Sequence, residues 1–219
     1  MTQSRSEVNI KKSPMISAII PALNEEKTVG DLVKDALNYV DEVIVVDDGS
    51  TDNTSDVAAD AGAEVIKHKY NMGVAKAIVN GFEKGKGEIL ITLDADGQHD
   101  PTDIPSLIEP ILNDQADLVL GRRPSIPRFS ERFITTLTRL KVDCSDASTG
   151  FRAIRRRIAE QMKIRGSCMC GTFILEANRL GARIAEVPIT VRKRREGGRR
   201  IQTRHVKQIF HVFYELIRA

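Results

Sequence analysis

The sequence predicts an α/β fold in which a mixed, mostly parallel sheet is flanked by helices. Over the first 120 residues, short apolar segments alternate with helical patterns, a rhythm typical of parallel strands joined by right-handed crossovers. Two predicted strands end in paired carboxylates, in "VVDDGS" and "LDAD". Because open α/β sheets bind ligands outside the carboxyl ends of their strands, these ends mark the expected site. The sequence has neither a glycine-rich dinucleotide fingerprint nor a Walker loop, which disfavours two common nucleotide folds.

Five segments of the first half are predicted to be buried strands because they are short, apolar and β-branched. In the first helical pattern, apolar residues recur at three and four positions from Val29 to Val40. The next two patterns end at glycines, and the prolines of "DIPSLIEPILND" predict a helix that is kinked or begins late. The predicted strands are 15–21, 42–48, 64–68, 88–94 and 117–121.

The second half is less regular. "PRFSERFITTLTRLK" is basic and amphipathic, "FILEANRLGA" is predicted to be a helix, and "RIAEVPIT" an edge strand that ends at proline. The chain ends in a predicted basic amphipathic helix, whose stripe would contact the core or a partner, or lie in a membrane interface. That stripe comprises Val206, Ile209, Phe210, Phe213, Leu216 and Ile217.

Composition and charge indicate a globular protein with an anionic partner. Hydrophobic residues make up 41% of the chain, no apolar run is long enough to span a bilayer, and the N-terminal stretch lacks a signal-peptide core, so we expect a cytoplasmic protein. The net charge is +3, but residues 192–200 carry six basic groups and residues 152–157 carry four. Such runs indicate a phosphate, membrane or nucleic-acid partner, unless they are solvated faces. Cys144, Cys168 and Cys170 are expected to be reduced thiols.

The stretch "ITLDADGQHDP" predicts a metal site. Asp94, Asp96 and Gln98 offer three oxygen donors within five residues. Mg²⁺ and Mn²⁺ prefer such oxygens and are commonly held by one or two carboxylates together with substrate phosphates. A lone Asp-x-Asp is also often a solvated turn. Here, however, "VVDDGSTDNT" and "IIPALNEE" end neighbouring strands, so the three ends together predict a pocket for a nucleotide diphosphate and its metal.

Six motifs, in this order, resemble family 2 glycosyltransferases of GT-A (Rossmann-like) fold. The similarity covers roughly residues 15–200 and is greatest to the dolichol-phosphate mannose synthase branch, which includes polyprenyl-phosphate glucosyltransferases; "DGQH" and "STGFR" carry the likeness to this branch. The motifs are "SAIIPALNEE", "EVIVVDDGSTDNT", "GEILITLDADGQHDP", "ADLVLGRR", "DASTGFRAIRR" and "EVPITVRKRREGGRR".

The resemblance implies an inverting, metal-dependent transfer of mannose or glucose from GDP-mannose or UDP-glucose to a polyprenyl or dolichyl phosphate. It implies Mg²⁺ or Mn²⁺ as cofactor and a peripheral position at the cytoplasmic membrane face, on an anionic surface or with a membrane partner protein, and no nucleic acid. We expect one domain spanning 1–219. Its parts would be a flexible N-terminus (1–13), a nucleotide-sugar-binding half (14–121), an acceptor-side half with the basic loop (122–200) and a C-terminal helix (201–219).

On the donor side, the resemblance assigns roles by position in the motifs. Asp94, Asp96 and Gln98 would hold the metal, while Asp96, Arg123 and Arg194 would be catalytic, because metal and arginines stabilise charge on the leaving diphosphate. Leu23 stands where the family often has an aromatic residue for stacking on the base. The donor-binding residues would be Pro21, Leu23, Glu25, Val46, Asp48, Asp94, Ala95, Asp96, Gln98, Arg123, Arg194 and Arg200.

On the acceptor side, the resemblance places Arg132 and Asp146, with Arg128 as an alternative to Arg132 because the segment before "DASTG" is short for the branch. A phosphate acceptor is already a nucleophile and needs cations for positioning, whereas a hydroxyl acceptor would need a general base, for which Asp146 is the candidate. Two alternatives therefore remain. One is a soluble glycosyltransferase of the same fold with a hydroxyl acceptor. The other is a non-catalytic basic binding module, against which the acidic residues argue.

Overall fold

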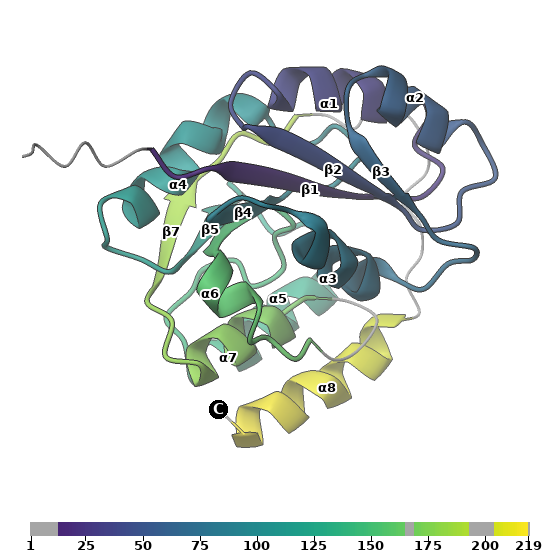
Figure 1. Cartoon of the computed structure of the whole chain (residues 1–219). Helices are drawn as coiled ribbons and strands as arrows, with labels where there is room; N and C mark the ends of the chain where they lie inside the picture. The colour runs from purple at the N-terminus through teal and green to yellow at the C-terminus, as the bar shows by residue number, and fades with distance from the viewer. Residues whose placement is uncertain (1–12, 165–168, 193–203, 219) are drawn as a thin grey trace, which may run out of the picture.

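A computed structural model describes residues 13–164, 169–192 and 204–218 and is built on one seven-stranded sheet (Figure 1). All five predicted strands are confirmed, and the strand order is β3-β2-β1-β4-β6-β5-β7. Strand β6 runs antiparallel to β4 and β5, while the other pairings are parallel. The strands are β1 (Ile16–Ala22), β2 (Glu42–Asp47), β3 (Glu64–Lys67), β4 (Ile89–Thr92), β5 (Leu118–Arg122), β6 (Arg152–Arg155) and β7 (Ile184–Pro188).

Helices cover both faces of the sheet. One face packs against α1, α2 and α4, and the other carries α3, α5, α6 and α7, with α8 packed outside α5 and α7, as Figure 1 shows above and below the strands. Alternate residues of β1 feed the two cores, Ala18 and Ile20 on one side and Ile19 on the other. The helices are α1 (Val29–Ala36), α2 (Thr54–Asp60), α3 (Val74–Lys84), α4 (Ile104–Leu112), α5 (Phe129–Thr138), α6 (Arg156–Ala159), α7 (Thr172–Arg179) and α8 (Arg204–Arg218).

Helix α4 begins late, as its prolines predicted, after the 3-10 turn η1 (Pro101–Asp103). The predicted edge strand is also confirmed, because β7 borders the sheet and ends at Pro188. Within the described parts of the chain, no helix is both long enough and apolar enough to cross a bilayer.

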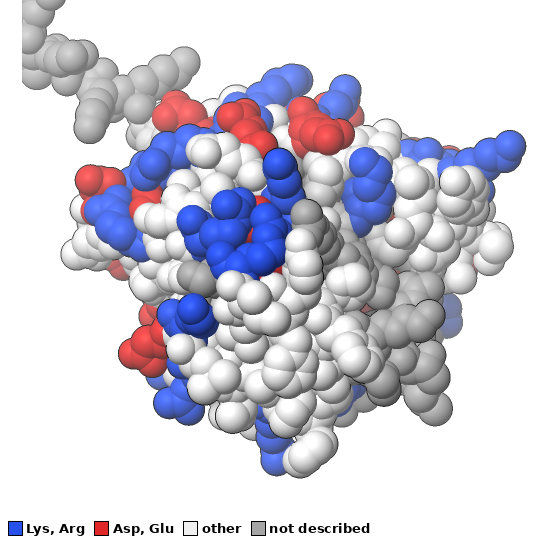
Figure 2. All heavy atoms as spheres, turned by 90° about the horizontal axis from the view of Figure 1, so that it is seen from below, with Lys and Arg blue, Asp and Glu red and all other residues white. Residues whose placement is uncertain are grey.

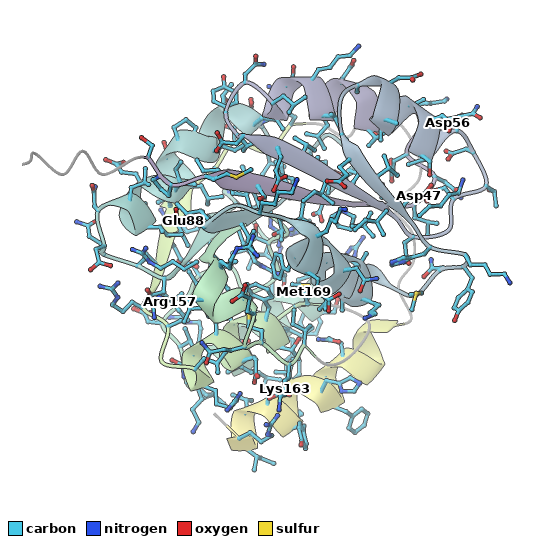
Figure 3. The ribbon with its side chains drawn as sticks, in the orientation of Figure 1. Asp47, Asp56, Glu88, Arg157, Lys163 and Met169 are labelled. Atoms are coloured by element: carbon cyan, nitrogen blue, oxygen red, sulfur yellow. The ribbon has the colours of Figure 1, made fainter. Side chains whose placement is uncertain are left out.

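The basic run 152–157 forms β6 and the start of α6, and its arginines bind within the protein. Arg155 donates to the Ile111 carbonyl at 2.6 Å, Arg156 donates to the Gly87 carbonyl at 2.7 Å, and Arg157 pairs with Asp117. In Figure 3, Arg157 lies on the left, away from Asp47 at the carboxyl end of β2. These contacts account for the run without an anionic partner.

Asp117 is buried beneath these arginines, and its charge should make stability depend on acid pH. Burial would raise its pKa, but hydrogen bonds from Arg183 and the charge of Arg157 outweigh burial and lower the pKa from 3.8 to about 2. A depressed pKa means that the ionised form stabilises the fold above the unfolded value and that this contribution is lost as pH falls through the folded value. We expect Asp117→Asn to unfold at lower urea than the wild type. The difference in unfolding free energy between the wild type and Asp117→Asn should narrow from about pH 4 to pH 2. A difference that stays constant over this range would contradict the lowered pKa of Asp117.

Candidate active site

The ends of β1 and β2 are joined into one wall. Pro21 and Val46 are partners in the parallel register, and the backbone N–H of Asn24 donates to the Ser50 hydroxyl at 2.9 Å. The Asn24 side chain in turn accepts from the backbone N–H of Thr51 at 2.8 Å. The backbone N–H of Glu25 donates to the Thr54 hydroxyl at 2.9 Å, so the segment with Leu23 and Glu25 is held against the β2 turn. The structure thus brings together the first four residues expected at the nucleoside.

The two carboxylates after β2 are buried and bound by the protein. Asp47 accepts from the backbone N–H of Ser50 at 2.7 Å. Asp48 accepts from the backbone N–H groups of Met72 and Gly73, each at 2.8 Å, and lies 2.8 Å from Nδ1 of His68. Asp48 therefore holds the loop 68–73 against the end of β2, and a contact with a nucleoside would add to these bonds.

The Asp-x-Asp turn follows β4 and lies beside α1. Thr28 Oγ1 is 2.8 Å from the Ala95 carbonyl and 3.3 Å from Oε2 of Glu25, so it links this turn to the β1 wall. Asp96 accepts from the backbone N–H of Gln98 at 3.1 Å. Gly97, with a φ of 72°, allows the left-handed turn between them. Sequence reasoning missed Thr28, whose capping position before α1 carries no chemical signature.

The two carboxylates fit a divalent metal that is completed by a substrate. Among the described residues, no group of three or more His, Cys, Asp or Glu side chains could hold a metal by itself. The Asp94 side chain is 48% exposed, and Asp96 is half-buried. Mg²⁺ retains water and is usually bound through one or two carboxylates and substrate phosphates, so a two-carboxylate turn open to solvent suits a metal–diphosphate. The side chain of Gln98, the third expected ligand, is half-buried in the same turn.

His99 lies directly behind the turn. Its Nδ1 accepts from the backbone N–H of Asp94 at 3.2 Å, and its ring stacks on Phe151 at 5.2 Å. Burial lowers the pKa of His99, against the opposing charges of Asp94 and Asp96. The next residue, Asp100, is paired with Arg192 at 2.7 Å. His99 thus helps to fix the backbone from which Asp94 projects.

Arg123, at the end of β5, is held by two carboxylates. Its Nε donates to Asp146 at 2.6 Å, and its Nη2 donates to Asp146 at 2.9 Å and to Glu131 at 3.2 Å. Burial opposes its charge, but Asp146, Glu131 and also Asp94 raise the pKa of Arg123. Asp146 is 1% exposed, and both of its oxygens accept from Arg123, which leaves it poorly placed to act as a base. No motif or spacing indicated that Glu131 belongs to this cluster.

The two acceptor-side arginine candidates differ in their contacts. Arg132 is exposed, and its Nε donates to the Ile126 carbonyl at 2.9 Å. Arg128 lies 3.6 Å from Glu131 and so joins the Arg123 cluster, which favours it as the cation nearer to the site. Arg194 and Arg200 lie outside the described residues.

Comparison with known proteins agrees with this arrangement. Residues 17–174 match glycosyl transferase family 2. A UDP-N-acetylglucosamine–dolichyl-phosphate N-acetylglucosaminyltransferase of Methanococcus voltae is 32% identical over 80% of this chain and 84% of its own. A dolichol-phosphate mannosyltransferase of Pyrococcus furiosus is 26% identical over 93% of this chain, which spans 64% of that relative.

The fold also agrees with that of a solved enzyme. Glucosyl-3-phosphoglycerate synthase of Mycobacterium tuberculosis, crystallised with Mn²⁺, UDP-glucose and phosphoglyceric acid, superposes with a TM-score of 0.74 at 26% identity. The aligned region covers 94% of this chain and 79% of that one. Because the family match extends from β1 into α7 and so contains the Asp-x-Asp turn, Arg123 and Asp146, this chain belongs to glycosyl transferase family 2.

Proposed function

We propose that the protein transfers a hexose, mannose or glucose, from a nucleotide-diphosphate sugar to a polyprenyl or dolichyl phosphate with inversion. The observation that carries this choice of acceptor is the state of Asp146, which is buried and bound through both oxygens to Arg123. A hydroxyl acceptor needs a general base to remove its proton, and Asp146, the candidate base, is engaged by Arg123, whereas a phosphate monoester needs a cation that positions it. The relatives named for dolichyl phosphate support the same class of acceptor.

The proposed mechanism places the donor mainly against residues 14–121, together with Arg123, and the acceptor against other residues of 122–200. The β1–β2 wall with Pro21 and Val46 would hold the nucleoside, while Asp94 and Asp96 would hold Mg²⁺ or Mn²⁺ against the diphosphate. When bound, the metal would supply positive charge to the leaving diphosphate. Arg123, held charged by its two carboxylates, would orient phosphate oxygens of the donor and would also stabilise the negative charge on the leaving diphosphate.

A donor and acceptor screen tests the proposal. GDP-mannose, UDP-glucose and UDP-N-acetylglucosamine would each be offered with a short polyprenyl phosphate, in Mn²⁺ and in EDTA. We expect one donor to be used, only with metal, and the polyprenol without its phosphate to be inert. The second candidate is a soluble hydroxyl acceptor, favoured by the phosphoglyceric acid bound to the mycobacterial enzyme. Transfer to 3-phosphoglycerate but not to the lipid phosphate would establish that candidate instead.

We further propose that helices α5 and α8, which contact each other, approach the membrane. Helix α8 packs on the core through Val212, with Ile209 and Leu216 of the expected stripe half-buried beside it. It turns Gln208 and Glu215 inward, where Gln208 donates to the Cys170 carbonyl and the Thr172 hydroxyl, both at 3.1 Å. Phe210, Phe213 and Ile217 are exposed instead, as are residues of α5 and of the turn after it. The exposed residues are Phe129, Phe133, Leu140, Phe210, Phe213, Tyr214 and Ile217.

Charge on the same helices suits an anionic surface. Arg132, Arg139 and Lys141 are exposed in and after α5. Figure 2, which views the molecule from the side of α8, shows a broad area free of charged side chains with Lys and Arg beside it. Apolar residues flanked by cations are typical of segments that lie in a bilayer interface, where each Lys or Arg contributes about 1 kcal/mol.

We expect the protein to co-sediment with anionic vesicles, and to do so less at high salt because the cations are screened. Phe210→Ser with Phe213→Ser should weaken partitioning about tenfold or more, because two partly inserted phenyl rings are lost. Tyr70→Ser, in the loop after β3, is the matched control, since Tyr70 is 66% exposed but lies outside both helices. Equal sedimentation of the double variant and the wild type would contradict this orientation.

A further inference from the structure

Gly150 lies against the carboxylate of Asp94. A Cβ atom added to Gly150 would be 2.2 Å from Oδ2 of Asp94 and 2.5 Å from its Cγ and Oδ1, and these are the three nearest atoms. The φ of Gly150 is not among the positive values of the chain, unlike that of Gly97. Gly97 has the opposite properties, with a φ of 72° and no atom closer than 3.9 Å to its added Cβ. Gly150 is therefore needed for space, whereas Gly97 is needed for backbone conformation.

The segment around Gly150 cannot easily retreat from Asp94. The Thr92 hydroxyl, at the end of β4, donates to the Gly150 carbonyl at 2.7 Å. The backbone N–H of Gly121, in β5, donates to the Phe151 carbonyl at 2.9 Å. Phe151 is fully buried and stacks on His99, which binds the backbone of Asp94. Two strands and the Asp-x-Asp turn thus fix the segment, so a new Cβ would displace the carboxylate rather than the backbone.

We propose that Gly150 is a positioning residue that seats the Asp94 carboxylate in its metal-binding orientation. The "STGFR" motif would then set the geometry of the donor end of the site, although in the sequence it stands on the acceptor side. This inference rests on the proposed function, because it gives Asp94 a metal to hold. It makes a separate claim, namely that the orientation of one carboxylate depends on the absence of one carbon atom at residue 150.

Direct Mn²⁺ binding tests the metal part. Calorimetry of Mn²⁺ in the presence of GDP or UDP should show binding about 10–100-fold weaker to Gly150→Ala than to the wild type, the range found when the supports of metal ligands are changed. Gly81→Ala, in α3, is the matched control. Its added Cβ would meet an atom at 2.3 Å, but the three nearest atoms all belong to Ile19, and Mn²⁺ affinity should not change.

A thermal-stability cycle tests the contact without any metal. Gly150→Ala should lower the melting temperature by about 2–4 °C, the effect of about 1 kcal/mol, because the half-exposed Asp94 carboxylate must turn away to relieve the overlap. In an Asp94→Ala background, the same substitution should have little further effect, because the atoms it meets are gone. The penalty of Gly81→Ala should persist in that background, because Ile19 is unchanged there.

The outcomes separate the two proposals. Wild-type Mn²⁺ affinity in Gly150→Ala, or a melting penalty that survives Asp94→Ala, would overturn the role of Gly150 while leaving the proposed function standing. A wild-type protein that binds no Mn²⁺ with either nucleotide would overturn the metal site, and the role of Gly150 with it. A wild-type protein that binds Mn²⁺ but transfers no sugar to a polyprenyl phosphate would count against the proposed function alone.

Discussion

Replacing Asp96 with alanine is expected to lower the rate of sugar transfer at least about 10²-fold, the scale of losing one group that stabilises transition-state charge. Asp96 is half-buried in the turn after β4, where its carboxylate accepts from the backbone N–H of Gln98. The turn should keep its shape in the variant, because the bond between Thr28 and the Ala95 carbonyl and the left-handed Gly97 hold it independently. The loss should therefore lie in the chemistry and not in the fold.

Transfer assays with a saturating donor would measure this loss, and circular dichroism would verify the fold. Asp56→Ala removes the same charge from the exposed surface of α2, marked in Figure 3, and should retain wild-type activity. EDTA should reduce the wild type to the level of Asp96→Ala but leave the variant unchanged. Wild-type rates in Asp96→Ala, or in the wild type with EDTA, would refute a metal-dependent mechanism.

The proximity of the expected donor-side residues was predictable because parallel strands place their carboxyl ends together. The expected strand ends gave the neighbourhood of Pro21, Val46 and Asp96 without knowledge of any side-chain contact. Contacts between segments that are distant in the sequence could not be predicted, because no periodic pattern indicates them. The contacts of Asp48 with the loop 68–73 and of Asp94 with Gly150 are of this kind.

In two elements, buried polar residues made the structure hard to predict from the sequence. Strand β6, "RAIR", has no strand pattern, because Arg152 is buried with its guanidinium 4.8 Å from the Phe173 ring and Arg155 satisfies a carbonyl of α4. Helix α8 buries Gln208 and Glu215 together with Val212, while Phe210, Phe213 and Ile217 of the expected stripe are exposed. An apolar stripe on a helix predicts that this face is buried, but it does not identify whether the core, a partner or a membrane buries it.

Asp146→Ala is expected to lower the unfolding free energy by about 3–5 kcal/mol and to reduce transfer severely, because the largely buried Arg123 guanidinium loses its closer carboxylate and keeps the weaker bond to Glu131 at 3.2 Å. The lost activity should follow from a displaced arginine, not from a missing base. Transfer by the variant should therefore show the same pH dependence as the wild type.

The companion variant Arg123→Met with Asp146→Leu separates stability from function. Replacing a buried ion pair by apolar residues of similar size is often neutral, so the double variant should regain much of the unfolding free energy in urea while remaining inactive. Glu131→Gln keeps the shape of the weaker partner of Arg123. It should therefore reduce both the unfolding free energy and the rate of transfer less than Asp146→Ala does. An Asp146→Ala protein that unfolds like the wild type and regains transfer at high pH would contradict the ion-pair role, since rising pH replaces a missing base but cannot reposition Arg123. The hydroxyl-acceptor candidate would then be favoured, with Asp146 as its base.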